Sequence, residues 1–431
     1  MSQAALLERA ERVLVGGSNG EFRLPPEANL VVSHGEGVTI HDTAGRAYID
    51  FLLGSGPMIL GHGHPDVVEA VTRQVSRGTT FMALNEPAIE LAERVVEAAP
   101  CGGKIRLVVT GSESIQFALR AARSFTGKDR YLRFEGGWHG VSDSALHGAR
   151  TLHPGAYPAT APDGGGIPRS WSADVLATPF NDVDQAVEVV EKHKGELAAI
   201  LIEPLQRCIL PRPGFFDAMR ELATRHGIVL IFDEIVTGFR MAWGGAQERY
   251  GVTPDLAVYG KTISGGYPMA AICGRADVMD VMDGWRPADD PRRIIVSGTF
   301  NGYPVGAVAG LATLDVLERP GIYERLFAMG GRITREITAM GDRHSIPLLV
   351  GGEGPVLQVL FTDEREIIDY GSMFRADKQK AFVFGVEMIK RGLFVSPYEK
   401  IYLSLAHTDA HIDRLLQSAE EVLRDVIAKM D

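Results

Sequence analysis

The sequence has little cysteine and no long apolar run. Its three cysteines in 431 residues, Cys101, Cys208 and Cys273, have neither the number nor the spacing for a disulfide framework or a zinc site. No apolar run approaches the roughly 18 residues that a membrane-spanning helix needs. Charged residues interrupt the first stretch, MSQAALLERAERVL, where a signal peptide would need an apolar core. We therefore expect a cytoplasmic globular protein in a reducing compartment.

Positive charge is scarce relative to negative charge. The 44 Lys and Arg residues against 55 Asp and Glu residues give a formal net charge of −11. This balance disfavours nucleic acid or an anionic membrane as the main partner. Repeats, low-complexity tracts and blocks of like charge are also missing. With 45% hydrophobic and 23% charged residues the composition is globular, and at about 150 residues per domain the length predicts two or three domains.

The common nucleotide-binding motifs are missing as well. YGKT at 259–262 resembles the end of a P-loop, but Asp255 stands where that motif needs a glycine, and no G-x-G-x-x-G fingerprint occurs. What the sequence does contain is an alternation of short apolar runs with amphipathic helical patterns. This alternation predicts an α/β fold of right-handed βαβ units with a mostly parallel sheet. The expected strands lie at 105–110, 130–134, 197–204, 228–234, 255–261 and 269–274.

Three further segments have distinct patterns. The stretch 141–170 is dense in Gly, Pro and Ala and predicts a long loop of the kind that often acts as a lid or binding segment. Residues 38–51 predict a β-hairpin with its turn at 43–45. After about residue 305 long helices predominate, with strands expected at 356–361 and 400–405, which indicates a smaller C-terminal domain.

A lysine and an aspartate follow two of the predicted buried strands. Lys261 lies among glycines at a strand end, where it is either a solvated loop residue or a Schiff-base nucleophile whose pKa is lowered by desolvation. Asp233 ends another strand, where it either caps the next helix or holds the protonated nitrogen of a pyridine ring. Because open α/β sheets bind ligands at these strand ends, the two residues together indicate pyridoxal phosphate chemistry.

Other strand ends carry residues with two interpretations each. Gly111 and Ser112 begin a predicted helix, where they bind a phosphate or where Ser112 is an ordinary N-cap. Trp138, followed by His139, stacks on a flat cofactor ring or belongs to the core. His62 and His64 have the spacing of a metal pair, but without further ligands the glycines and proline around them favour a turn.

Taken together, the chain resembles the class III aminotransferases, pyridoxal-phosphate enzymes of the aspartate aminotransferase superfamily, from about residue 12 to 425. The branch it resembles most is the one that includes glutamate-semialdehyde aminomutase. The resemblance implies a type I fold with a large domain at 56–305 and a small α+β domain made of 1–55 and 306–431. The segments that carry it are AYIDF, GHGHP, TGSES, RFEGGWHG, IEP, IFDEIVTGFR, DLAVYGKTISGGYP, SGTFNGYP and SPYEKIYLSLAHTD.

The resemblance also implies roles for single residues. Lys261 would form the aldimine and shuttle the proton, and Asp233 would pair with the pyridinium nitrogen. Ile235 and Trp138 would pack on the two faces of the ring, with His139 in the same cofactor site. The remaining cofactor residues would be Gly111 and Ser112 at the phosphate, Thr299 reaching that phosphate from the partner subunit, and Glu203 near the ring oxygen.

Three positions are implied to meet the substrate. Arg23 matches the residue that holds the substrate carboxylate in the aminomutase, and Glu399 matches that enzyme's glutamate. Ser55 replaces a tryptophan of the aminomutase. This replacement predicts a larger pocket and a bulkier substrate than the semialdehyde.

These inferences predict a homodimeric aminotransferase that passes an amino group between an amino acid or amine and a keto acid or aldehyde. Pyridoxal 5′-phosphate would be its cofactor and pyridoxamine 5′-phosphate an intermediate. The alternative is an isomerase of the same fold, either an aminomutase or an epimerase. A non-catalytic binding protein is a third interpretation, against which the presence of Lys261 and Asp233 argues.

Overall fold

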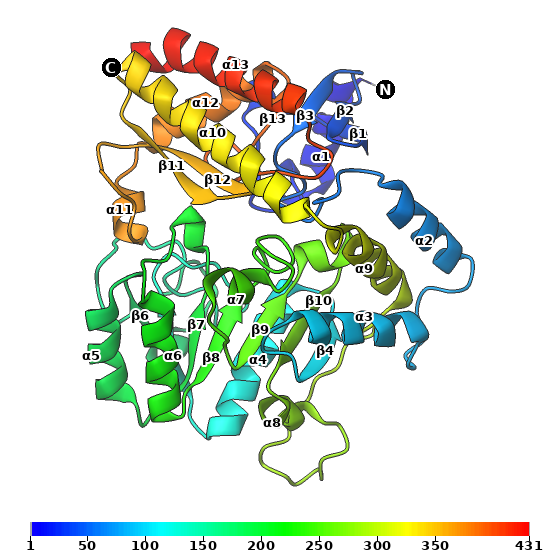
Figure 1. Ribbon diagram of the computed structural model, residues 1–431, viewed down its shortest axis with the longest axis vertical. Helices are drawn as coiled ribbons and strands as arrows, with labels where there is room; N and C mark the ends of the chain where they lie inside the picture. Colours follow the sequence, from blue (N-terminus) through cyan, green and yellow to red (C-terminus); the bar gives the residue numbers. More distant parts are fainter. Residues whose placement is uncertain (1, 431) are drawn as a thin grey trace. The chain divides into compact units, whose positions relative to one another are not determined.

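The computed structural model describes residues 2–430 and divides the chain into two compact units (Figure 1). Unit 1 comprises the chain up to Pro65, Glu324–Arg365 and the chain from Ala376 onward, so both chain ends contribute to it. Unit 2 comprises Asp66–Tyr323 and the short return segment Glu366–Arg375. The predicted divisions at 55/56 and 305/306 lie somewhat earlier in the chain than these. The return of 366–375 to unit 2 was not foreseen.

Unit 2 is built on a seven-stranded sheet with the order β4-β10-β9-β8-β7-β5-β6. The strands β5 to β9 pair in parallel, whereas β10 is antiparallel to both of its neighbours. The mostly parallel sheet expected from the sequence is therefore confirmed, with one reversed strand. The bounds are β4 Lys104–Val108, β5 Arg130–Phe134, β6 Val175–Thr178, β7 Leu197–Ile202, β8 Val229–Asp233, β9 Leu256–Tyr259 and β10 Ala270–Gly274.

The central strands are apolar without interruption because both faces of the sheet are covered. Alternate residues of β8 enter two different buried clusters, Val229 and Ile231 in one and Leu230 and Phe232 in the other. Helix α4 packs in the first cluster and helices α5 and α6 in the second. The helices of unit 2 are α2 Pro65–Val75, α3 Glu86–Ala98, α4 Gly111–Thr126, α5 Val183–His193, α6 Phe215–His226, α7 Gly245–Tyr250, α8 Ala276–Met279, α9 Pro304–Leu317 and α11 Tyr370–Phe374.

Helix α4 shows how local sequence fixes an element next to the sheet. Thr110 is its N-cap and forms a capping box with Glu113. Gly127, the predicted stop, ends the helix at a φ of 68°, which a residue with a Cβ adopts only with strain. The interpretation of Ser112 as the N-cap is therefore wrong, because Thr110 holds that place.

Unit 1 contains two small sheets flanked by helices. The predicted hairpin at 38–51 is present as the antiparallel pair β2 and β3. Strand β13 pairs in parallel with β3, and β12 pairs antiparallel with β11 and β14. The bounds are β1 Val32–Glu36, β2 Thr39–Asp42, β3 Ala47–Asp50, β11 Leu348–Glu353, β12 Val356–Phe361, β13 Leu393–Phe394, β14 Ile401–Tyr402, α1 Gln3–Val13, α10 Ile322–His344, α12 Lys378–Lys390 and α13 Asp409–Asp425.

Two further observations bear on predictions from the sequence. His62 of the GHGHP segment lies 2.8 Å from Asp50, with its Nε2 at the Oδ2 of that carboxylate, so its ring ties a turn to the end of β3. In the part of the chain that the structure describes, no helix combines the length and apolarity needed to cross a membrane.

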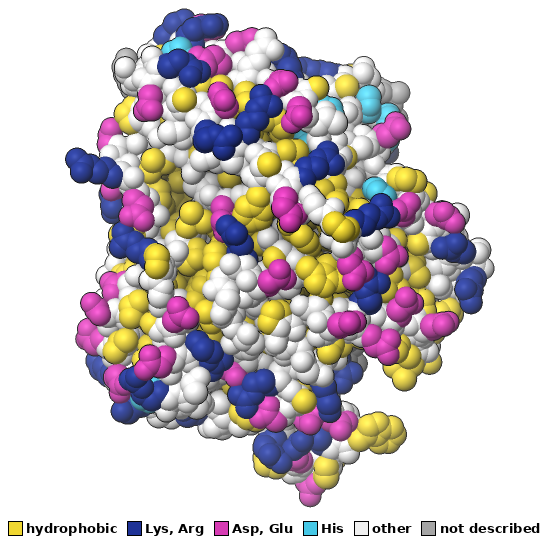
Figure 2. Space-filling view, viewed as in Figure 1, with side chains coloured by type: hydrophobic (Ala, Val, Ile, Leu, Met, Phe, Trp, Pro, Cys, Tyr) yellow, Lys and Arg dark blue, Asp and Glu magenta, His cyan; other side chains and the backbone are white. Residues whose placement is uncertain are grey.

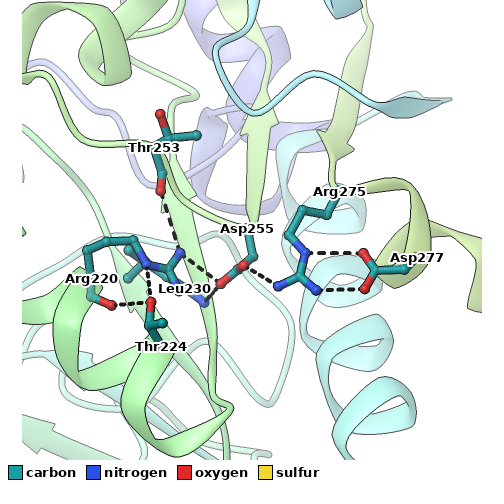
Figure 3. A network of polar contacts seen from close by, with 7 residues as sticks. All are labelled: Arg220, Thr224, Leu230, Thr253, Asp255, Arg275 and Asp277. Carbon is teal, nitrogen blue, oxygen red and sulfur yellow. Dashed lines mark hydrogen bonds and ion pairs between the residues drawn. The ribbon is translucent and has the colours of Figure 1, made fainter.

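A buried carboxylate joins three elements at the amino end of β9 (Figure 3). Asp255 accepts hydrogen bonds from Arg220 of α6 at 2.9 Å, from Arg275 at 2.7 Å and from the amide of Leu230 at 2.8 Å. Arg275 also pairs with the exposed Asp277. Because Asp255 is only 3% exposed, its charge depends on these three donors.

We expect Asp255→Asn to lower the free energy of unfolding by about 3 kcal/mol, since the amide replaces a buried carboxylate that binds two arginines and a backbone amide at once. Asp277→Asn is the matched control, because it removes a half-exposed partner of the same arginine and should cost less than about 1 kcal/mol. Urea unfolding of the two variants checks this difference. Equal losses would show that Asp255 is no more important than a surface ion pair.

Candidate active site

The predicted site residues of unit 2 gather at one edge of its sheet. Asp233 is the last residue of β8, Glu203 follows β7, and Lys261 follows β9 after a single glycine. Trp138 lies in the turn after β5. Because these four strands are parallel neighbours, their carboxyl ends and the residues that follow them share one edge. Gly111 and Ser112 begin α4 after β4, which runs in the same direction as β9.

Asp233 and His139 form a buried pair. The Nδ1 of His139 lies 2.8 Å from Oδ2 of Asp233, and the amide of Ile235 donates to Oδ1 at 3.2 Å. Burial lowers the pKa of His139, so the ring is neutral and donates to the carboxylate from Nδ1. Asp233 is only 3% exposed, and these two donors bind its two carboxylate oxygens.

Lys261 stands at a strained point of the backbone. Its φ of 46° lies in the left-handed region, and Gly260 before it is extended. The following residue, Thr262, is held in turn by the fully buried Arg240, whose Nη2 donates to the threonine hydroxyl at 2.9 Å. Arg240 also donates from Nε to the carbonyl of Val236. The turn that carries Lys261 is thus tied to the turn after β8.

Two glycines make room for Ile235 at this edge. A Cβ on Gly260 would lie 2.8 Å from Cδ1 of Ile235, and a Cβ on Gly111 would lie 3.0 Å from the same atom. A side chain at either position would therefore force Ile235 to shift. The isoleucine packs between the start of α4 and the start of the lysine turn, where it offers an apolar surface next to Asp233.

The start of α4 meets the turn that carries Trp138. The amide of Val141 donates to the hydroxyl of Ser112 at 3.1 Å, and a Cβ on Gly140 would lie 2.5 Å from that same hydroxyl oxygen. The amide of Trp138 donates to Glu203 at 3.1 Å. Trp138 itself is only partly buried and has the guanidinium carbon of Arg150 4.8 Å from its ring centre. Its ring is therefore not fully enclosed by the core.

Thr299 is not joined to these residues. It is exposed, and no hydrogen bond within the described residues links it to Gly111 or Ser112. The amide of Asn301 donates to Gly298 in a turn around it. An exposed position fits the prediction that Thr299 serves a partner subunit.

The three predicted substrate residues lie in unit 1. Ser55 and Glu399 follow β3 and β13, two parallel neighbours, so both lie past the same edge of that sheet. Phe22 packs edge-on against Phe394 of β13 at 6.4 Å between ring centres, which brings the segment of Arg23 to the same strand. Arg23 and Glu399 are exposed.

Sequence reasoning missed two buried arginines of this edge. Arg133 and Arg240 are fully buried, and each binds backbone carbonyls near the site residues. The available signal was a basic residue inside an apolar pattern, as in RYLRF and IVTGFR. A charged residue at such a place must have internal partners.

Comparison with known proteins shows the family to which the chain belongs. The class III aminotransferase family matches residues 24–423. A glutamate-1-semialdehyde 2,1-aminomutase of Methanothermobacter thermautotrophicus is 38% identical over 428 residues, covering 98% of this chain and 99% of that protein. An omega-transaminase from Sphaerobacter thermophilus is 34% identical with a TM-score of 0.92, covering 98% and 97% of the two chains. A transaminase with bound pyridoxal phosphate is 26% identical with a TM-score of 0.90, covering 99% and 98%.

These similarities extend over nearly the whole length of each chain compared. They confirm the family, the aminomutase-like branch and the fold that the sequence motifs indicated. The chain belongs to the class III aminotransferase family of pyridoxal-phosphate-dependent enzymes.

Proposed function

We propose that this protein is a pyridoxal-phosphate-dependent aminomutase of the glutamate-semialdehyde type, the isomerase that the sequence analysis gave as the alternative. The curated relative at 38% identity over almost the full length of both chains carries this proposal and favours it over the plain aminotransferase predicted first. Intermolecular amino transfer is the second candidate. It is supported by Ser55, which stands in place of a tryptophan, and by the similarity to a solved omega-transaminase.

The residues at the strand edge fit the cofactor. Asp233 is buried at this edge, and a protonated ring nitrogen beside its carboxylate would give that group a partner of opposite charge. Gly111 and Ser112 begin a sixteen-residue helix, whose first amide groups and positive dipole end suit a phosphate. The glycines around Ile235 leave an apolar surface beside Asp233 on which a flat ring can lie.

Bound pyridoxal phosphate supplies an electron sink that lets a proton leave the carbon beside the substrate's amino group. The chain's own residues do the rest. Lys261 would accept that proton on Nζ and would deliver it to another carbon. Asp233 keeps the ring nitrogen protonated, and the hydrogen bond from Nδ1 of His139 orients that carboxylate. Glu203, which accepts the Trp138 amide, would lie near the ring oxygen.

Three residues of unit 1 are proposed to contact the substrate. Arg23 would bind the substrate carboxylate through its planar fork of donors. Glu399 would disfavour a second carboxylate and favour an amino-bearing or neutral side chain. Ser55 would leave room for a substrate bulkier than the semialdehyde, which is the observation that keeps the second candidate open.

Exposed apolar residues support a dimer. Large hydrophobic side chains are exposed in two stretches, among them Met82 at 80% and Leu84 at 89% in one and Ile295 at 75% in the other. Hydrophobic side chains are visible at the surface over α2 and α3 (Figure 2). The side chain of Asn85 donates to the carbonyl of Gly302 at 2.8 Å, so the two stretches are neighbours. An exposed apolar patch of this kind fits a subunit interface that includes Thr299.

The product of one reaction separates the two candidates. With glutamate 1-semialdehyde alone, an aminomutase forms 5-aminolevulinate without consuming a second substrate. An aminotransferase instead needs an amino donor and a keto acid and converts one into the other. We expect the isomer as product and, after borohydride reduction, a covalent cofactor label on Lys261. Amino transfer between separate donors and acceptors without isomerisation would establish the second candidate. Label on another lysine would remove Lys261 from the reaction.

We expect Asp233→Asn to lower kcat at least about a hundredfold, because a neutral amide does not stabilise a protonated ring nitrogen. Glu234→Gln is the matched control. It alters the adjacent buried carboxylate, whose pKa burial raises and whose oxygens bind the amides of Ala246 and Gln247. That variant should lose stability but keep most of its kcat. Steady-state kinetics with thermal unfolding of both variants checks the difference. Near-normal turnover of Asp233→Asn would contradict the assignment.

Mixed dimers test whether Thr299 acts across an interface. Thr299→Ala and Ser112→Ala should each weaken cofactor affinity about tenfold or more, by loss of one hydrogen bond to a charged group. If Thr299 serves the partner's site, a mixed dimer of the two variants contains one site with both residues intact. Cofactor titration should then show one tight and one weak site per dimer. Two equally weakened sites, or a fully active monomer in light scattering, would contradict the proposal.

A further inference from the structure

Two arginines hold the turn after β5 by its carbonyl oxygens. Arg133, on β5 itself and fully buried, donates from Nη1 to the carbonyl of Ala145 at 2.6 Å and from Nη2 to the carbonyl of Gly137. None of the described carboxylates forms an ion pair with it. A buried cation without a counter-ion is costly, so its two carbonyl contacts account for its presence.

Arg207 makes the same kind of bridge from the other side. It donates from Nε to the carbonyl of Gly136 at 2.8 Å and from Nη2 to the carbonyl of Ala149 at 3.1 Å. Its φ of 51° and the φ of 62° at Cys208 place two consecutive non-glycine residues in the left-handed region. Residues persist there only where their surroundings hold them, and such strain gathers at functional sites.

Arg133 therefore connects the carbonyl of Gly137 to that of Ala145, and Arg207 connects the carbonyl of Gly136 to that of Ala149. Trp138 and His139 lie in the chain between these bound carbonyls. The two arginine side chains thus tie the two ends of the loop together. Trp138 and His139, the residues proposed to meet the cofactor, are therefore held at both ends.

Further contacts hold the same loop. The amides of Ala149 and Arg150 both donate to the carboxylate of Asp163 at 2.9 Å, and the amide of Gly136 donates to Gly148 at 2.7 Å. Arg150 is thereby held at the backbone, with its guanidinium over the ring of Trp138. The first part of the stretch 141–170, predicted to be a long loop of the kind that often acts as a lid or binding segment, is thus tied down by hydrogen bonds.

We propose that Arg207 and Arg133 are positioning residues that clamp the segment 136–149 and so hold Trp138 and His139 in place before any ligand binds. The role of Trp138 and His139 rests on the proposed function, whereas the clamp itself does not. Its central consequence is that the segment is rigid in the cofactor-free protein.

Hydrogen exchange of the cofactor-free protein, read by mass spectrometry, tests the clamp. We expect Arg207→Gly to raise exchange of the amides at 148–151 and 163 at least tenfold. Arg207→Ala should raise exchange in the same segment. Because glycine adopts a φ of 51° without strain and alanine does not, the unfolding temperature of Arg207→Gly should equal or exceed that of Arg207→Ala. Arg207→Lys should be intermediate, since one ammonium group replaces a fork that spans two carbonyls.

Arg212→Gln is the matched control, because it removes a nearby arginine whose ion pair with Glu366 lies on the surface. Its exchange at 148–151 should stay within twofold of the unmodified protein. Unchanged exchange in Arg207→Gly would overturn the proposal. An exchange increase that extends evenly over β7 and β8 would also overturn it, because the loss would then be one of general stability. In the loaded protein, the clamp variants should also lose part of the visible circular dichroism of the cofactor. If the protein binds no cofactor, the proposed function is refuted. The exchange result on the cofactor-free protein still decides whether Arg207 holds the segment.

Discussion

The buried carboxylate of Asp233 is the feature around which the strand-edge site is organised. It lies at the end of a strand whose other residues are apolar, where it accepts hydrogen bonds from His139 and from the amide of Ile235. A buried carboxylate needs hydrogen-bond donors or a cation, and a protonated nitrogen placed beside it would supply both. The contact with His139 fixes the orientation of the carboxylate.

Glycines and arginines then shape the space beside that charge. Gly111 and Gly260 lack side chains where Ile235 needs room, and Gly140 lacks one where the Ser112 hydroxyl lies. Arginines act in the opposite way, by reaching across gaps to bind carbonyl oxygens that no strand or helix satisfies. Arg240 does this behind the lysine turn. The result is a site whose surrounding turns are held by bonds from arginine side chains to backbone carbonyls.

The residues proposed to bind the substrate belong to a different unit from Asp233 and Lys261. Ser55 and Glu399 follow two paired strands of unit 1. If they bind the substrate as proposed, changes at those positions would alter which compound is bound without removing the hydrogen bonds of Asp233 to His139 and Ile235.

The sequence by itself determined those features that depend on local spacing. The strands at 130–134 and 356–361, the end of α4 at Gly127 and the hairpin at 38–51 follow from apolar periodicity and turn residues, which act within a few positions. The positions of Asp233 and Lys261 at strand ends follow from the same patterns. Only the tertiary structure decided which distant residues meet. His139 and Asp233 are 94 positions apart, the reversed direction of β10 is not visible in its apolar run, and Arg207 binds carbonyls far from it in the chain. Periodicity reports that a residue is buried, whereas its partner depends on the path of the whole chain.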